Sequence, residues 1–422
     1  MSEKSNSEAF ASDLLKQFEH ILESDPLIDE VGFIHPSQFV ALKEEVGGSL
    51  SSSEGGVLQS QDALENGITN FWNRDHKLGI STQIVISLYK AAKNAFMAAH
   101  RQHKTSNDET LASEVLIHGR ALLLLSCDFG TAWNSRKLIA SKKQLLPIFM
   151  DELRLSALVL SYSPKSEQAW SHRRWVINMI SGRCSTLQEI IERESELVEK
   201  IAESSKMNYR AWNHRCWLVS YMTREQVLHE LKKSRNWAGL HVADNSCFHY
   251  RRRLMLMNLE GVCHSQENDS SGYNVKTYRV WKEELDWNEA LIKRYVGREA
   301  LWLHRRFLCL YWIRHITANL LGISCQSEPK SSVDNDIDSF LDHELCLLDS
   351  CSTVPDDDFE DFQAQAIHSA TYMLWLTKQI PKSRGIDLQD KLADLTRLLS
   401  KACPERSSLW DYLVDNHCER EN

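Results

Sequence analysis

The chain has few of the residues that strand-rich folds place in their turns. Its 422 residues include only 16 glycines and 8 prolines. Because sandwiches and barrels use both residues in many tight turns, this scarcity favours a helical fold. Apolar residues make up 42% of the chain and charged residues 25%, so most of it should fold. The length fits two or three ordinary domains or one elongated array.

An excess of positive charge and a long apolar run are also missing. The net charge is −9, which argues against a general nucleic-acid binder, since such proteins displace phosphate counterions with Lys and Arg. The longest apolar run, residues 121–125, is far too short to span a membrane. The first ten residues lack the basic and then apolar pattern of a signal peptide. We therefore expect no membrane span, no nucleic acid and a cytoplasmic protein.

The eleven cysteines show no metal-binding spacing. The sequence has no CxxC pair, and no Cys/His pair recurs at the spacing of zinc ligands. The nearest combination is His343, Cys346 and Cys351 in "HELCLLDSC". We expect no metal and no cofactor bound by this chain.

One short motif recurs five times. The copies are "TAWNSRKLI" (131–139), "QAWSHRRWVI" (168–177), "RAWNHRCWLV" (210–219), "CFHYRRRLM" (247–255) and "ALWLHRRFL" (300–308). Each copy has an arginine three residues after an aromatic residue. The pairs are Trp133/Arg136, Trp170/Arg173, Trp212/Arg215, Phe248/Arg251 and Trp302/Arg305. Such repetition indicates one structural unit used several times.

The repeated unit is predicted to be a helical hairpin. Residues 187–201 place their apolar side chains on one face at helical period, and a short polar turn then leads to the next motif. A single hairpin cannot bury its own apolar face, whereas stacked hairpins can. The predicted fold is therefore all-α, an alpha-alpha superhelix of tandem helical hairpins.

This pattern divides the chain into three parts. Residues 1–110 form an N-terminal helical extension with a flexible insert, 111–315 hold the five repeats, and 316–422 hold a polar insert and closing helices. Outside the repeats, helices are expected at 8–24, 80–104, 339–350, 360–380 and 386–402. Polar inserts are expected at 47–56, 265–274 and 327–338. Residues 407–413, "SSLWDYL", resemble a decayed last copy.

The aromatic and the arginine of each copy are predicted to lock one hairpin to the next. Residues i and i+3 are neighbours on a helix, and a guanidinium offers a planar fork for a carboxylate. If the fork is buried and paired, Arg215→Ala should destabilise the fold by roughly 3–5 kcal/mol. The histidines two residues after the aromatic (His172, His214 and His304) are expected at the surface or an interface. The additional arginines Arg174, Arg252 and Arg306 are either solvated charge or a face that binds a partner or a phosphate.

The repeats resemble those of the alpha subunits of protein prenyltransferases. "MNYRAWNHRCW" (207–217) and "SPKSEQAWSHRRW" (163–175) carry the resemblance, which covers residues 115–310 strongly. The N-terminal segment and the inserts indicate a divergent branch, similar to the alpha-subunit repeat-containing members of this family. The resemblance implies a helical crescent around a separate beta subunit, of the Rab geranylgeranyltransferase type. That beta subunit holds zinc and transfers a farnesyl or geranylgeranyl group to C-terminal cysteines of protein substrates.

The resemblance also implies two site residues. A family lysine that holds the diphosphate lies five residues before the tryptophan of its repeat, and Lys165 lies five residues before Trp170. The family's Asn-Tyr after this lysine is Ser166-Glu167 here, so Lys165 is either a diphosphate ligand or a surface lysine at a helix start. Tyr209 matches a family tyrosine that faces the isoprenoid. The alternative function is a non-enzymatic helical-repeat scaffold for protein–protein interaction.

Overall fold

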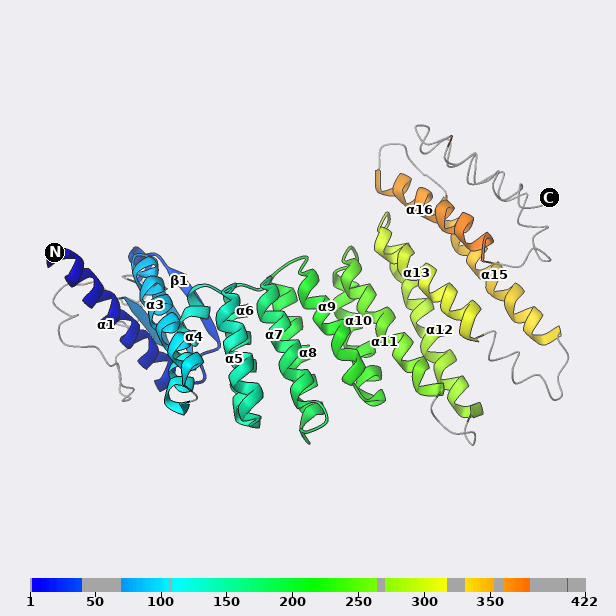
Figure 1. Ribbon diagram of the computed structural model, residues 1–422. Helices are drawn as coiled ribbons and strands as arrows, with labels where there is room; N and C mark the ends of the chain where they lie inside the picture. The colour runs from blue at the N-terminus through cyan, green and yellow to red at the C-terminus, as the bar shows by residue number, and fades with distance from the viewer. Residues whose placement is uncertain are drawn as a thin grey trace, which may run out of the picture. The chain divides into compact units, whose positions relative to one another are not determined.

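Tandem α-helices make up most of the described chain. The computed structural model describes residues 2–39, 70–106, 108–263, 270–316, 331–352, 360–379 and 408. The chain divides into two compact units, Met1–Arg215 and Cys216–Asn422. Consecutive helices form hairpins in each of them (Figure 1). The predicted all-α fold of tandem helical hairpins is confirmed.

The first unit contains the first two copies of the motif, together with Trp212 and Arg215 of the third. Copies one to three lie on α5, α7 and α9, and each follows a partner helix. Helix α3 packs on α4, and α6 packs on α7. The helices of this part are α1 (Ser2–Ser24), α3 (Val85–Thr105), α4 (Glu109–Leu125), α5 (Gly130–Lys143), α6 (Leu146–Tyr162), α7 (Glu167–Ile180), α8 (Leu187–Ser204) and α9 (Tyr209–Leu218).

Short polar residues set the ends of these helices. The Asp108 side chain accepts a hydrogen bond from the backbone N–H of Thr110 and begins α4. The Ser166 hydroxyl accepts from the N–H of Ala169 and begins α7. Both satisfy backbone donors that the first helical turn leaves without partners. These caps fix the residues at which α4 and α7 begin.

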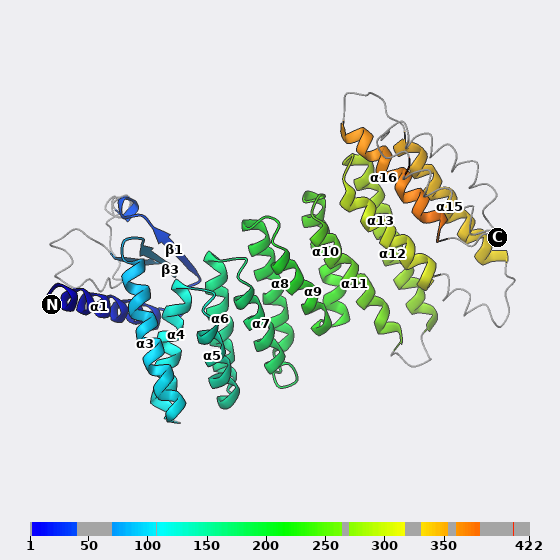
Figure 2. The same cartoon turned by 45° about the horizontal axis from the view of Figure 1, so that its top comes forward.

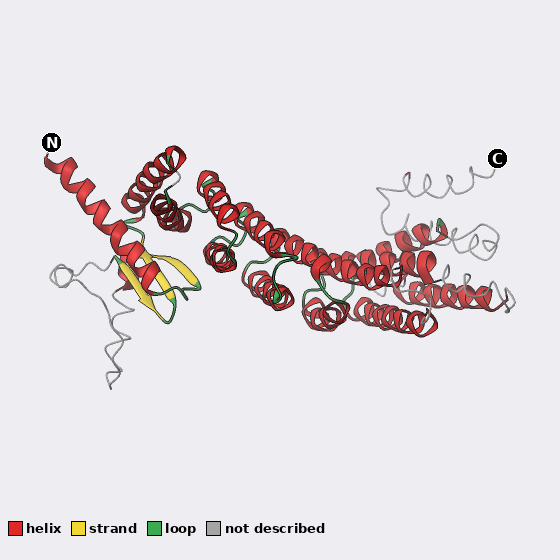
Figure 3. Ribbon diagram, turned by 60° about the horizontal axis from the view of Figure 1, so that its bottom comes forward, coloured by secondary structure: helices red, strands yellow, loops and turns green. Residues whose placement is uncertain are grey.

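A small three-stranded sheet precedes the hairpins and was not predicted. The strand order is β1 (Glu30–Ile34), β3 (Lys77–Ser81), β2 (Phe71–Arg74). β1 pairs with β3 in parallel and β2 pairs with β3 in antiparallel fashion. All strands of the described chain lie in this N-terminal part (Figure 3). The expected helix at 80–104 therefore begins only at Val85, after β3 has ended.

The sheet extends the hydrophobic core of the first unit. Val31, Leu78 and Ile80 are buried together with side chains of α1, α3 and α4. β1 packs on α6 (Figure 2). The Val31 backbone N–H donates to the Ser161 hydroxyl over 3.1 Å. The N-terminal segment is thereby attached to the first hairpins rather than forming a separate tail.

The second unit contains the fourth and fifth copies. Helix α11 packs on α10, α13 packs on α12, and α16 packs on α15. Thr223 and Gln226 form a capping box at the start of α10. The helices are α10 (Arg224–Leu240), α11 (Asn245–Cys263), α12 (Ser270–Arg294), α13 (Glu299–Tyr311), α15 (Ser331–Ser352) and α16 (Glu360–Thr377), with a 3₁₀ turn at Val219–Tyr221 and a π turn at Trp312–Ile316.

Gly297, in the loop before α13, occupies a position that only glycine fits. Its φ is +74°, and a Cβ there would lie 2.7 Å from the backbone oxygen of Asp361. A left-handed backbone and so close a contact both exclude a side chain. The loop before α13 can therefore lie directly against the start of α16.

Two of the predicted inserts are partly helical. Residues 331–338, expected in a polar insert, lie in α15, and residues 270–274 lie in the first turns of α12. The linker at 47–56, the helix at 386–402 and most of the copy at 407–413 lie outside the described residues. The predicted domain boundaries near 110 and 315 stay predictions.

Candidate functional site

The repeated aromatic and arginine residues lie inside the protein. None of the ten is more than 5% exposed. Their i, i+3 spacing places both on the side of each motif helix that faces neighbouring helices. The ten residues are Trp133, Arg136, Trp170, Arg173, Trp212, Arg215, Phe248, Arg251, Trp302 and Arg305.

Four of the arginines bind a buried glutamate on a following helix. The Nε atom donates to a carboxylate oxygen over 2.8–3.0 Å, and an Nη atom pairs with the other oxygen. The pairs are Arg136–Glu152, Arg173–Glu194, Arg251–Glu284 and Arg305–Glu344. We refer to these four pairs as the buried Arg–Glu series. Each pair connects one hairpin to the next, and the fork geometry fixes the orientation of both groups.

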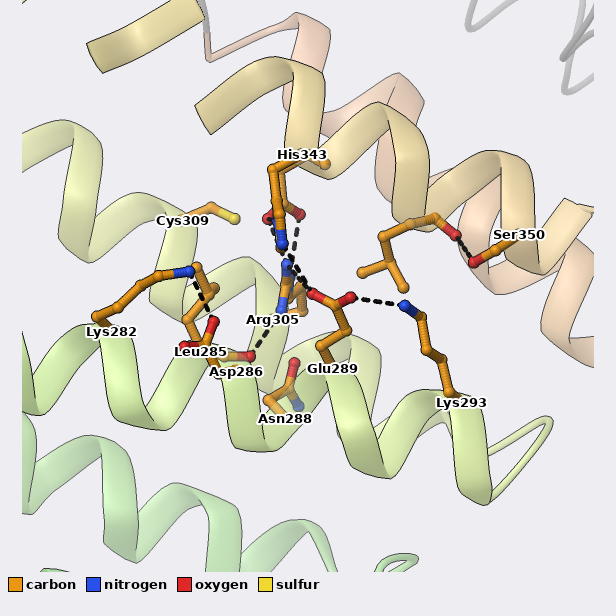
Figure 4. Close-up of polar contacts among 12 residues, drawn as sticks. Lys282, Leu285, Asp286, Asn288, Glu289, Lys293, Arg305, Cys309, His343 and Ser350 are labelled. Atoms are coloured by element: carbon orange, nitrogen blue, oxygen red, sulfur yellow. Dashed lines mark hydrogen bonds and ion pairs between the residues drawn. The ribbon is translucent and has the colours of Figure 1, made fainter. Parts of the chain in front are cut away.

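Each of these arginines also binds the hairpin to which it belongs. Its Nη1 atom donates to the backbone oxygen of the residue 20 positions earlier, over 2.5–2.9 Å. For Arg305 the acceptor is Leu285, and Glu289 lies within ion-pair distance at 3.6 Å (Figure 4). One guanidinium therefore holds two helices of its own hairpin and the first helix of the next.

Arg215 has a different set of contacts. Its Nε atom donates to the Ser195 hydroxyl over 3.1 Å, and its Nη2 atom lies 3.3 Å from Glu199. The guanidinium also lies over the Trp212 ring, 5.4 Å from its centroid. The Arg215 side chain is fully buried.

The expectation that His172, His214 and His304 are surface or interface groups is wrong. All three are fully buried, and their Nε2 atoms donate to Glu152, Glu194 and Glu284 over 2.8–3.1 Å. Each ring also packs on the aromatic residue of the preceding copy, with centroids 4.6–5.2 Å apart. Other helices pack against the motif helix on more than one face, so the histidine is buried although it lies on a different face from the arginine.

The glutamates of the series are ionised in the folded protein. Burial alone raises the pKa of Glu152, but the charge of Arg136 and the bond from His172 outweigh it and lower the pKa to about 2. The pKa of Glu194 is about 2 for the same reasons. Burial lowers the pKa of His304 to about 4, against the attraction of Glu284, so this histidine is neutral near pH 7.

The sequence contains a signal for these glutamates that the aromatic–arginine spacing alone does not reveal. Glu152, Glu194 and Glu284 each lie 20 residues before a motif histidine. Glu230 lies 20 residues before Tyr250, whose hydroxyl donates to it over 2.6 Å. This constant distance marks three of the four glutamates of the series in the sequence; Glu344, which binds Arg305 and Tyr372, does not follow it.

An exposed loop edge lies at the start of the second and third motif helices. It comprises residues 163–167 and 205–210. The Pro164 carbonyl accepts from the Trp170 indole N–H over 3.0 Å and from the Asn208 amide over 2.8 Å. These bonds bring the loop that carries Lys165 to the loop that carries Tyr209. Lys165 is exposed, and Tyr209 is 70% exposed.

Glu167 is bound between two arginines at this edge. Its Oε1 atom accepts from Arg174 over 3.0 Å, and its Oε2 atom accepts from Arg210 over 2.9 Å. Together with Lys165, the group contains three cationic side chains and one anionic one. These four side chains therefore carry an excess of two positive charges, although a carboxylate follows the lysine.

Comparison with known proteins places these repeats in a family. The model of the protein prenyltransferase alpha subunit repeat matches residues 149–180, 191–222 and 281–312. Protein prenyltransferase alpha subunit repeat-containing protein 1 of Danio rerio is 31% identical over 321 residues, which cover 67% of this chain and 73% of the relative. The chain belongs to the family of protein prenyltransferase alpha subunit repeat-containing proteins. Its Homo sapiens relative of the same name is 29% identical, with 58% of this chain and 69% of the relative covered. The 1-B protein of Xenopus laevis is 26% identical, with 79% and 85% covered.

The geometry extends the alpha-subunit repeat beyond the three matched segments. Those segments contain Trp170, Trp212 and Trp302. The copies at Trp133 and Phe248 have the same buried aromatic and the same bidentate arginine. They are therefore repeats of the same kind.

The additional arginines of this family member are not simply solvated. Arg174 pairs with Glu167 of the exposed loop edge. In the second unit, Arg306 lies over the Trp375 ring at 5.8 Å, and burial lowers the pKa of Arg252 to about 10. Of these three arginines, only Arg174 contributes to the charge at Lys165.

The described part of the chain offers neither a metal site nor a spanning helix. Among the described residues, no group of three or more His, Cys, Asp or Glu is placed to hold a metal ion. His343 pairs with Glu289 over 3.3 Å (Figure 4). Cys346 is exposed and Cys351 is buried. No helix within the described ranges is both long and apolar enough to cross a membrane.

Proposed function

We propose that this chain is the alpha-type subunit of a protein prenyltransferase. It would associate with a zinc-bearing beta subunit, of the Rab geranylgeranyltransferase type. The complex would transfer a geranylgeranyl or farnesyl group to C-terminal cysteines of cytoplasmic proteins. This chain would not be active alone. The observation that carries the proposal is the family's repeat, with a lysine at the family position on an exposed edge.

The exposed loop edge is the part of the chain that we assign to the reaction. Transfer of the isoprenoid leaves a diphosphate, and positive groups stabilise the negative charge that develops on it. Lys165 supplies a charge that is not paired with a carboxylate in the described structure. Arg174 and Arg210 neutralise Glu167, which would otherwise weaken the field of the lysine. Zinc in the partner would hold the cysteine of the protein substrate as a thiolate, which is the nucleophile.

Tyr209 fits a contact with an apolar group. Its ring is mostly exposed, and Met207 beside it is 85% exposed. An aromatic ring next to an apolar side chain suits an isoprenoid chain or the apolar part of a partner. We assign Tyr209 to the isoprenoid side of the same edge.

Co-expression with a candidate beta subunit tests the proposal. We expect recovery of a stoichiometric complex and prenyl transfer to a peptide that ends in cysteine. Lys165→Ala should slow transfer by roughly tenfold or more, because one stabilising charge is lost from an exposed position. Association of the subunits should not change. Lys200→Ala, an exposed lysine on α8, is the matched control and should transfer at the wild-type rate.

The scaffold alternative has its own support and predicts another outcome. Glu167 stands where the family has a tyrosine, so the edge departs from the enzyme pattern at its centre. A scaffold would recover protein partners without a beta subunit and without transfer. Recovery of the complex with equal rates for Lys165→Ala and wild type would remove Lys165 from the site.

A further inference from the structure

A cavity in the first unit lies away from the exposed loop edge. Its volume is about 270 Å³, and it lies between the segment after α1, helix α4 and helix α6. Much of its wall is aliphatic. The aliphatic side chains are Ile28, Leu116, Ile117, Ile148, Leu155 and Leu158. The volume lies just below the roughly 300–1,000 Å³ of pockets that hold drug-sized molecules, so a ligand here would be small.

The charged groups of the wall are paired, with one exception. Glu152 binds Arg136 and His172, and Asp151 accepts from Arg154 over 2.9 Å. Arg120 also lines the cavity. Within the described residues, its guanidinium makes no hydrogen bond and no ion pair.

The surroundings of Arg120 destabilise the charged form of its side chain. The side chain is half-buried, and burial together with the charge of Arg136 lowers its pKa. A guanidinium does not lose its proton at neutral pH, so it cannot escape this cost by becoming neutral. Binding of an anion relieves it.

The carboxylates nearest to Arg120 do not fill this role. Asp151, Glu23 and Asp25 attract it only at longer range. Asp151 is bound to Arg154, and Asp25 accepts from the Leu27 N–H over 3.1 Å and lies 2.9 Å from His76 Nδ1. Arg120 thus lines the cavity, while Asp151 and Asp25 have other partners and Glu23 makes no hydrogen bond or ion pair with it in the described structure.

We propose that this cavity binds a small aliphatic carboxylate. The carboxylate pairs with the Arg120 fork, and the alkyl chain lies against the side chains of α4 and α6. A planar fork matches a carboxylate by two parallel hydrogen bonds. The aliphatic wall favours a ligand with several methylene groups over acetate. This site is independent of prenyl transfer and does not depend on the proposed function.

Binding of hexanoate to the full chain near pH 7 tests the proposal by calorimetry. We expect saturable binding that is at least about tenfold tighter than that of acetate, since each buried methylene contributes about fourfold. Hexanol has the same chain without the charge and should also bind at least tenfold more weakly. Equal affinities for hexanoate and hexanol, or no saturable binding of hexanoate, would overturn the proposal.

Substitution of the arginine tests the same site from the protein side. Arg120→Met keeps the length of the side chain and should remove the preference for hexanoate over hexanol. The matched control is Arg101→Met, an exposed arginine on α3, which should keep wild-type affinity. An Arg120→Met chain that still prefers hexanoate contradicts the assignment. If this variant does not fold, the comparison of the three ligands on the wild-type chain decides alone.

Discussion

The buried Arg–Glu series and the exposed loop edge are built from the same hairpins, yet they differ in how strictly they repeat. Three residues after each aromatic the chain always has arginine. Five residues before each aromatic it has five different residues: Asp128, Lys165, Met207, Ala243 and Gly297. The arginine is buried in every copy, and in four of the five copies it binds a glutamate and a backbone carbonyl in the same way. Arg215 binds Ser195 and Glu199 instead. The loop before the helix has different neighbours from copy to copy, as Gly297 against the Asp361 backbone shows, so the repeats differ there.

This difference suggests that the buried Arg–Glu series stabilises the fold and that the exposed loop edge serves function. A buried guanidinium that loses its carboxylate, or the reverse, leaves an uncompensated charge. An exposed side chain in a loop can change with little effect on folding. We therefore expect variants of the series to change stability and variants of the edge to change activity.

Removal of one arginine of the series should have the largest effect on stability. Arg173→Ala leaves Glu194 buried with only His214 as a remaining partner and frees the Leu153 carbonyl. We expect a loss of roughly 3–5 kcal/mol in the free energy of unfolding, measured by urea denaturation. The same range is predicted for Arg215→Ala. Arg154→Ala, which breaks an exposed pair with Asp151, should cost at most about 1 kcal/mol. Similar costs for Arg173→Ala and Arg154→Ala would contradict the role of the series.

Acid should weaken the series in two steps. The folded-state pKa of His304 is about 4, below the ordinary 6.5, so the unfolded state binds the proton first. Stability is complete above about pH 6.5 and falls between 6.5 and 4. The pKa of Glu152 and Glu194 is about 2 instead of 4.5, so their contribution is lost as the pH falls from 4.5 toward 2. The loss in the free energy of unfolding should be on the order of a few kcal/mol for each of these groups.

Chemical denaturation at several pH values measures this dependence. His304→Phe removes one of the three buried histidines and keeps an aromatic ring, so it should reduce the loss of stability between pH 6.5 and 4 without abolishing it. Burial also lowers the pKa of His172 and His214, which remain. A free energy of unfolding that is constant from pH 7 to pH 4 would show that the buried histidines are not coupled to folding.

The bond that joins the two loops of the edge should have a moderate effect. Asn208→Ala removes the hydrogen bond that the side-chain amide donates to the Pro164 carbonyl. It also removes the helix cap, in which Asn208 Oδ1 accepts from the Ala211 N–H. We expect a loss of about 1–2 kcal/mol in the free energy of unfolding. Asn213→Ala, at an exposed position of α9, is the control and should be close to neutral. An Asn208→Ala chain as stable as this control would mean that the two loops are not held together by the amide.

Neutralisation of Glu167 should have the smallest effect on stability and a visible effect on activity. Glu167→Gln breaks two partly exposed ion pairs, so the free energy of unfolding should change by less than about 1 kcal/mol. In the assembled transferase, the more positive edge should lower the KM for the isoprenoid diphosphate by roughly threefold. A raised KM would mean that the carboxylate orders the arginines for the diphosphate, and the charge argument for Lys165 would fail.

The N-terminal sheet shows what repetition cannot predict. β2 and β3 are joined by Asp75 and His76, both with positive φ, instead of the Asn-Gly or Asp-Gly pair that usually signals such a turn. β1 lies more than 40 residues earlier and pairs in parallel with β3. Neither a local turn signal nor strict alternation of apolar residues was present to reveal these strands.

Sequence by itself determined that the chain is a series of helical hairpins with a buried aromatic and arginine in each. The helical period of the apolar residues and the recurrence of the aromatic–arginine motif can both be read directly from the sequence. Only the tertiary structure decided what the arginines and histidines bind, because a spacing of 20 residues does not by itself show that two helices are neighbours. It also decided that Glu167 is neutralised by Arg174 and Arg210, and that Arg120 faces a cavity without a partner. Charges act through space, so their balance at a site depends on which helices pack side by side.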